Sequence, residues 1–137
     1  MNLYGATVAN LAELMDKLGE PSYRARQTAE WLYRHHADAP DAMKNLPSTL
    51  RERLAADHEL RTPEAEDAGR SEDGTRKYTW EAFGGDVYES ALIPDGRRLT
   101  LCVSSQAGCK VGCKFCLTAR KGLRQNLSPA EILGQYR

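Results

Sequence analysis

The chain has 137 residues, an ordinary length for one domain, and its 41% hydrophobic residues suffice for a modest core. No apolar run approaches the roughly 20 residues that span a bilayer, and the amino terminus lacks a signal-peptide pattern. Composition therefore argues against a membrane protein or a secreted one, and we expect a cytoplasmic location.

Charge is distributed unevenly along the chain, although the formal net charge is zero. Residues 1–96 carry 11 Lys and Arg against 18 Asp and Glu, a net charge of −7, whereas residues 97–137 carry 8 against 1, a net charge of +7. A field of one sign attracts phosphates and anionic cofactors, but a basic segment can also be a solvated face or meet acidic groups elsewhere. Nucleic acid is therefore one partner class among these.

The first 60 residues predict a small helical domain. Apolar residues recur at helical spacing, Gly19 is expected to end the first helix, and Ser22 is expected to cap the second. The expected helices cover residues 10–18, 23–36 and 48–57, with a turn at 41–44. The residues expected to face inward are Leu11, Leu14, Met15, Leu18, Ala25, Ala29, Leu32, His36, Leu50 and Leu54.

The spacing of apolar residues changes after residue 60. Residues 61–75 are polar and acidic and predict a linker or exposed loop. Apolar and polar residues then alternate, which predicts strands, and Gly84-Gly85 is a hairpin turn signal. The expected strands cover residues 76–83, 86–93 and 99–104.

The last helix is expected to begin at Ser128, because Ser128, Pro129 and Glu131 match a capping box with proline at the first helical position. A strand at 99–104, a loop and this helix predict one βα unit. We therefore expect a mixed α+β and α/β fold. Its expected parts are residues 1–60 as a helical domain, 61–75 as a linker and 76–137 as the start of a second domain.

Four cysteines lie within fifteen positions, and three of them, Cys109, Cys113 and Cys116, have the spacing C-x3-C-x2-C. Thiolates at this spacing can converge on one zinc or iron–sulfur centre, and three ligands leave one coordination position open. Gly112 allows the backbone to bend between them, and Phe115 is expected to supply an apolar wall.

Other uses of the cysteines remain open. Four thiolates, with Cys102 as the fourth, could hold zinc in an RNA-binding module, although only one C-x2-C pair occurs. Two disulfide bonds are a further alternative, which the expected reducing compartment disfavours. The C-x2-C-x2-C-x3-C spacing of a simple ferredoxin is absent.

The cysteine segment resembles the signature of the radical S-adenosylmethionine (radical SAM) superfamily, because an aromatic residue precedes its third cysteine. Its flanks are similar to the RNA adenine-C2 methyltransferases, the RlmN and Cfr family. The residues that carry this resemblance are Cys102–Cys109 (CVSSQAGC), Gly122, Asn126-Leu127, Glu131-Ile132 and Gln135. The sequences at 19–25 (GEPSYRA) and 31–33 (WLY) resemble the family's amino-terminal accessory domain.

The resemblance implies a fold, an activity and cofactors. The fold would be an RNA-binding helical domain, a β-hairpin and the first βα unit of a radical SAM partial (β/α) barrel. The activity would be methylation at C2 of adenine in 23S ribosomal RNA and in tRNA. Cys109, Cys113 and Cys116 would hold a 4Fe-4S cluster that cleaves S-adenosylmethionine, with an electron from a donor such as flavodoxin or ferredoxin.

The resemblance also implies catalytic roles for two residues. Glu89 matches the family's proton acceptor and Cys102 matches its resolving cysteine, whereas a lone strand glutamate would otherwise be read as a surface residue. The family's second catalytic cysteine has no counterpart, so we expect a monomeric fragment that is inactive alone. Leu123 and Gln125 depart from the family pattern, which leaves a paralogue with another RNA target open.

Overall fold

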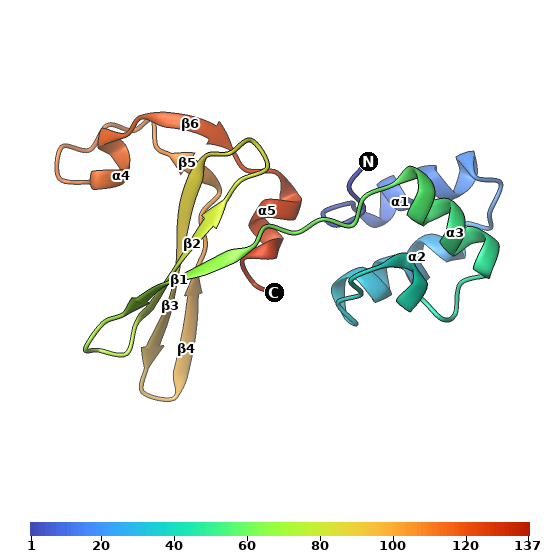
Figure 1. Ribbon diagram of the computed structural model, residues 1–137, viewed down its shortest axis with the longest axis horizontal. Helices are drawn as coiled ribbons and strands as arrows, with labels where there is room; N and C mark the ends of the chain where they lie inside the picture. Colours follow the sequence, from blue (N-terminus) through green and yellow to red (C-terminus); the bar gives the residue numbers. More distant parts are fainter. The chain divides into compact units, whose positions relative to one another are not determined.

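The computed structural model describes all 137 residues, and the chain divides into two compact units, residues 1–61 and residues 62–137 (Figure 1). Each unit is described by itself below. No helix in either unit has the length and apolar character that crossing a membrane requires.

The first unit is helical, as expected. Its elements are α1 (Val8–Lys17), α2 (Tyr23–Tyr33), the 3-10 helix η1 (Pro40–Ala42) and α3 (Ser48–Asp57). Thr7 caps α1, since its side chain accepts a hydrogen bond from the Asn10 N–H at 3.1 Å. Gly19 follows α1 with φ +70°, the left-handed conformation that terminates helices. The cap predicted at Ser22 is wrong, because its side chain makes no capping hydrogen bond.

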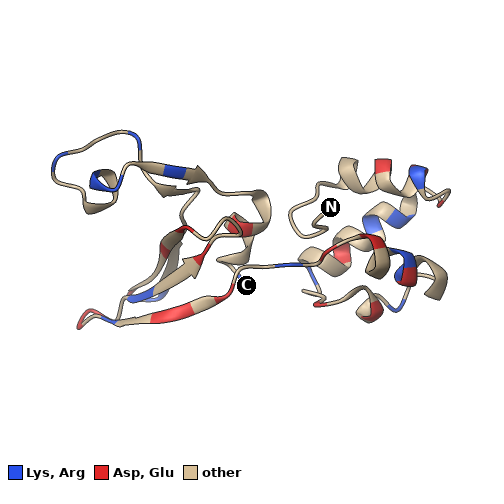
Figure 2. Cartoon of the chain, turned by 45° about the horizontal axis from the view of Figure 1, so that its top comes forward, with Lys and Arg blue, Asp and Glu red and all other residues tan.

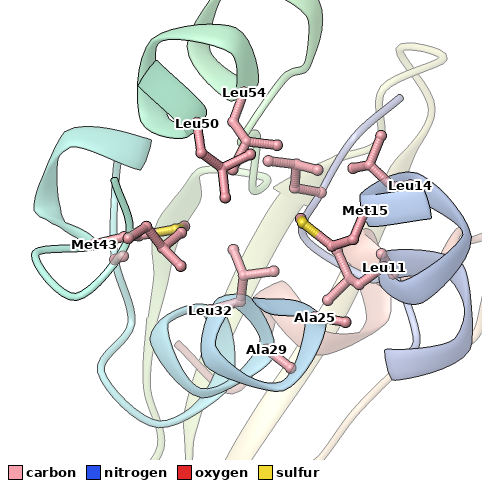
Figure 3. Packing of buried hydrophobic residues seen from close by; sticks show 13 residues of the cluster. Leu11, Leu14, Met15, Ala25, Ala29, Leu32, Met43, Leu50 and Leu54 are labelled. Carbon is pink, nitrogen blue, oxygen red and sulfur yellow. The ribbon is translucent and has the colours of Figure 1, made fainter. Parts of the chain in front are cut away.

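The core of this unit consists of the apolar helix faces that the helical spacing predicts (Figure 3). Its fully buried side chains include Leu11, Met15, Leu32, Leu50 and Leu54. The inward position predicted for His36 is wrong. The helix ends at Tyr33, His36 takes a left-handed conformation with φ 49° and is exposed, and Ala37 is buried instead.

The second unit contains a four-stranded antiparallel sheet in the order β1-β2-β3-β4. These strands are β1 (Ala65–Arg70), β2 (Arg76–Glu81), β3 (Val87–Asp95) and β4 (Arg98–Cys102). The linker or loop predicted at 61–75 is therefore wrong over β1, which pairs with β2 from Ala65 opposite Trp80 to Arg70 opposite Arg76. All six residues of β1 are exposed, so it shows no alternation of buried and exposed positions.

The strand before the cysteine segment also differs from the expectation. Residues 98–102 form β4, which returns antiparallel to β3 through a two-residue turn, with Asp95 opposite Arg98. A separate short strand, β5 (Gln106–Gly108), leads into the cysteine segment and pairs with β6 (Leu123–Asn126). The mixed helix-and-strand fold is confirmed, but β5, not 99–104, is the strand directly before the cysteine segment.

Two helices complete this unit, α4 (Leu117–Arg120) and α5 (Pro129–Gly134). The predicted capping box is confirmed, since the Ser128 side chain accepts from the Glu131 N–H and the Glu131 carboxylate accepts from the Ser128 N–H. A small core lies beside α5 and consists of Trp80, Ala82, Tyr88, Ala107 and Leu127. Trp80 and Tyr88 of this core lie on one face of the sheet, and Lys77, Glu89 and Ala91 lie on the other, because side chains alternate along a strand.

Candidate active site

A cavity of about 610 Å³ lies between β3, β4, β5 and α4. Its volume is within the range of small-molecule sites, which is roughly 300–1,000 Å³. Glu89 and Cys102 both line it, together with Ser104, Gln106 and Arg120 among other residues. The structure therefore brings the two expected catalytic side chains to one place, beside the segment that carries the other three cysteines.

The register of the sheet explains why Glu89 and Cys102 line the same cavity. Ala91 on β3 pairs with Cys102 on β4. Side chains alternate between the two faces of a strand, so Glu89 and Ala91 share a face. The Ser104 hydroxyl donates a hydrogen bond to the Glu89 carbonyl oxygen at 2.6 Å, which ties β3 to the chain just after β4.

Lys77 is a residue of the cavity that the sequence reasoning did not identify. Its Nζ lies 3.1 Å from Oε2 of Glu89, and the two side chains are 50% and 54% exposed. At this exposure the ion pair contributes little to stability, about 0–1 kcal/mol. It does give the Glu89 carboxylate a nearby cation. Only the pairing of β2 with β3 could have indicated this contact, because it places Thr79 opposite Glu89 and Lys77 one diagonal step away.

The cysteine segment is a loop closed at its base. The Cys109 N–H donates to the Gly122 carbonyl at 3.1 Å, and Gly108 has φ +76°. A Cβ atom at Gly108 would overlap the Gly122 carbonyl oxygen, so only glycine permits this close approach. The predicted bend at Gly112 is confirmed by its φ of +74°.

The thiol of Cys116 lies at the amino end of α4. The backbone N–H groups of Ala119 and Thr118 in the first turn of α4 lower the pKa of the thiol. The thiolate is the form that binds metal, so this environment favours ligation. All four cysteines are free, which gives no support to a disulfide bond.

The three sulfur atoms are not gathered as a metal site. No three His, Cys, Asp or Glu side chains lie close enough together to hold a metal ion. Phe115 is 91% exposed, and its role as an apolar wall stays a prediction. What fits an iron–sulfur cluster is the donor set: three thiols on one short loop, one of them with a lowered pKa.

The surface around the cysteine segment is basic. Glu131 is the single acidic residue among residues 97–137, and it is buried at 3% exposure. All the basic residues of this region are exposed, and Figure 2 shows no acidic colour on α4, on β6 or on the loop before α4. These residues are Arg97, Arg98, Lys110, Lys114, Arg120, Lys121, Arg124 and Arg137.

Comparison with known proteins identifies the relatives of this chain. Residues 1–60 match the family described as the ribosomal RNA large subunit methyltransferase N-terminal domain. The chain is 44% identical over 135 residues to the dual-specificity RNA methyltransferase RlmN of Marinobacter nauticus, and 42% identical over 134 residues to that of Pseudomonas fluorescens. The chain belongs to the RlmN family.

The chain spans little more than a third of the length of these RlmN relatives. The two matches cover 98% of this chain, but 37% and 35% of the relatives. A crystal structure of a radical SAM methyltransferase from Sphaerobacter thermophilus matches with a TM-score of 0.83 and 41% identity, over 99% of this chain and 40% of that one. The radical SAM resemblance is thus confirmed, while the roles of Glu89, Cys102 and the three other cysteines stay predictions.

Proposed function

We propose that this chain is part of a radical SAM enzyme that methylates C2 of adenine in 23S ribosomal RNA and in tRNA. The RlmN relatives support this activity through their name, dual-specificity RNA methyltransferase. The observation that carries the proposal is the shared cavity, in which Glu89 and Cys102 lie beside the loop of Cys109, Cys113 and Cys116.

Cys109, Cys113 and Cys116 are the proposed ligands of a 4Fe-4S cluster. Their thiolates are the donors that such clusters use, and the lowered pKa of the Cys116 thiol favours the ligating form. The chemistry that the bound cluster supplies is one-electron cleavage of S-adenosylmethionine, with the electron delivered by a donor such as flavodoxin or ferredoxin. Three ligands from the protein leave one iron available to the cofactor.

Glu89 and Cys102 are proposed to act on the RNA base. The Glu89 carboxylate accepts the proton that leaves C2 of the adenine, and Nζ of Lys77 lies 3.1 Å from it. The Cys102 thiol is proposed to attack the sulfur of an adduct between a second cysteine and the RNA base, so that an S–S bond forms as the C–S bond breaks and the methylene carbon takes up the thiol proton to become the methyl group. With three cysteines assigned to the cluster and Cys102 to this step, none of the four is left to carry the adduct, so we expect no turnover by residues 1–137 alone.

RNA binding is proposed to rest on the exposed cations of residues 97–137 and on the helical domain of residues 1–60. Exposed Lys and Arg attract phosphates and release counterions on binding. We expect a monomer. We also expect a cytoplasmic location, because the proposed substrates are ribosomal RNA and tRNA.

Anaerobic reconstitution with iron and sulfide tests the cluster assignment. We expect about four iron atoms and about four sulfides per chain, with Cys113→Ala losing them and the matched variant Cys102→Ala retaining them. Stoichiometric zinc without sulfide, or loss of metal in both variants, would instead indicate a four-cysteine metal site.

A further inference from the structure

Gln135 is a buried polar side chain, 5% exposed, just beyond the end of α5. Its Oε1 accepts a hydrogen bond from the Ser104 N–H, and its Nε2 donates to the Ser104 carbonyl, each at 2.8 Å. Nε2 also donates to the carbonyl of Glu131 at 3.2 Å. These contacts determine the orientation of the amide, because exchanging its oxygen and nitrogen would set two donors against each other.

The two hydrogen bonds to Ser104 imitate the pairing of β-strands. In an antiparallel sheet, two opposite residues exchange both N–H···O bonds. Gln135 does the same for Ser104 with one side chain, at a point where β4 has already ended at Cys102. The next residue is also held, since the Leu127 N–H donates to the Ser105 carbonyl at 3.0 Å. The chain between β4 and β5 is therefore attached to the segment that surrounds α5.

Ser104 in turn connects the two proposed catalytic residues. Its hydroxyl donates to the Glu89 carbonyl at 2.6 Å, and it lies two positions after Cys102. Glu89, Cys102 and Ser104 line the same cavity. Whatever holds Ser104 thus extends the attachment of β4 to β3 beyond the last strand pair, Ala91 with Cys102, to the Glu89 carbonyl.

We propose that Gln135 is a positioning residue of this site, which holds Ser104 and thereby sets Glu89 and Cys102 in place. The proposal rests on the proposed function for the roles of Glu89 and Cys102. The contact itself requires neither cluster nor RNA, so it is tested without catalysis. The competing explanation is that Gln135 only completes the carboxyl end of α5 through its bond to Glu131.

Nuclear magnetic resonance of the isotope-labelled 137-residue chain distinguishes the two explanations. The variants are Gln135→Leu, which removes both bonds to Ser104, and Gln135→Glu, which keeps an acceptor for the Ser104 N–H and loses the donor. Leu133→Ala is the matched control, because Leu133 lies on α5 but its apolar side chain is exposed and forms no hydrogen bond to Ser104. The readouts are hydrogen exchange of the Ser104 amide, the nuclear Overhauser effect between Ser104 and Glu89, and the amide shifts of Glu89 and Cys102.

We expect Gln135→Leu to accelerate exchange at Ser104 at least tenfold, to remove the Overhauser effect and to shift the Glu89 and Cys102 signals. Gln135→Glu should give an intermediate exchange rate. Leu133→Ala should leave exchange at Ser104 within about twofold of the parent. In every variant, unchanged signals from the β2–β3 pairing show that the sheet is folded.

Three results would overturn the proposal. The first is a parent Ser104 amide that exchanges as fast as exposed neighbours. The second is a Gln135 variant that melts at a lower temperature while the Ser104 and Glu89 signals stay unchanged. The third is equal acceleration by Leu133→Ala, which would assign the effect to α5 as a whole. None of these results depends on cluster loading. The proposal for Gln135 and the proposed function can therefore fail independently of each other.

Discussion

Replacing Glu131 by Gln tests how the second unit is held together. The carboxylate is 3% exposed and accepts three hydrogen bonds. Oε1 accepts from the Phe83 N–H at 2.7 Å, and Oε2 accepts from the N–H and the hydroxyl of Ser128, each at 2.6 Å. Glu131 therefore joins the chain just after β2 to the start of α5.

The expected loss follows from these contacts. Gln offers one acceptor oxygen in place of two, so its NH₂ group must face either the Phe83 N–H or the Ser128 donors. A hydrogen bond to a charged group contributes about 1.5–3 kcal/mol. A negative charge in the first turn of a helix adds about 0.3–1 kcal/mol. We expect Glu131→Gln to lower the free energy of unfolding of the second unit by roughly 2–4 kcal/mol.

Urea denaturation measures this change if the fluorescence signal comes from the second unit alone. Trp31 lies in the first unit and Trp80 in the second, so Trp31→Phe serves as the common background. Glu72→Gln is the matched control, because Glu72 is exposed and its replacement should change stability by less than about 0.5 kcal/mol. A Glu131→Gln effect no larger than that of the control would refute the reasoning.

Burial, together with the nearby charge of Glu131, raises the pKa of Tyr88 to about 12. Since the raised pKa exceeds the ordinary value of 10, the stability that the protonated Tyr88 hydroxyl contributes is full below pH 10 and is lost as pH rises through about 12. Denaturation at alkaline pH should show this loss for the parent and not for Tyr88→Phe. Burial, together with the charge of the amino terminus, lowers the pKa of His58 below 6.5. The first unit should therefore lose stability in denaturation experiments as pH falls below 6.5, and His58→Gln should remove that loss. Neutralising Arg120, Lys121 and Arg124 together should flatten the salt dependence of RNA binding, whereas an unchanged slope of affinity against salt would mean that these residues do not contact phosphates.

The sequence determines those features that residues a few positions apart encode. The buried faces of α1 and α3 follow from apolar residues three and four apart, and the start of α5 follows from Ser128 and Glu131. The cysteine spacing with its flanks likewise predicts the family, because the motif is contiguous. Single residues were less predictable: the chain turns earlier than the apolar pattern suggests, so His36 is exposed and Ala37 is buried.

Only the tertiary structure decides which distant segments pair. All six residues of strand β1 are exposed, and its pairing with β2 makes it a strand. The ion pair of Lys77 with Glu89, the position of Cys102 beside them and the bonds of Gln135 to Ser104 depend on sheet register and on contacts up to 31 residues apart. Register changes every side-chain neighbour across a strand pair while leaving the local pattern of each strand unchanged. The sequence therefore predicts which residues form the site, and the pairing of strands decides which of them meet.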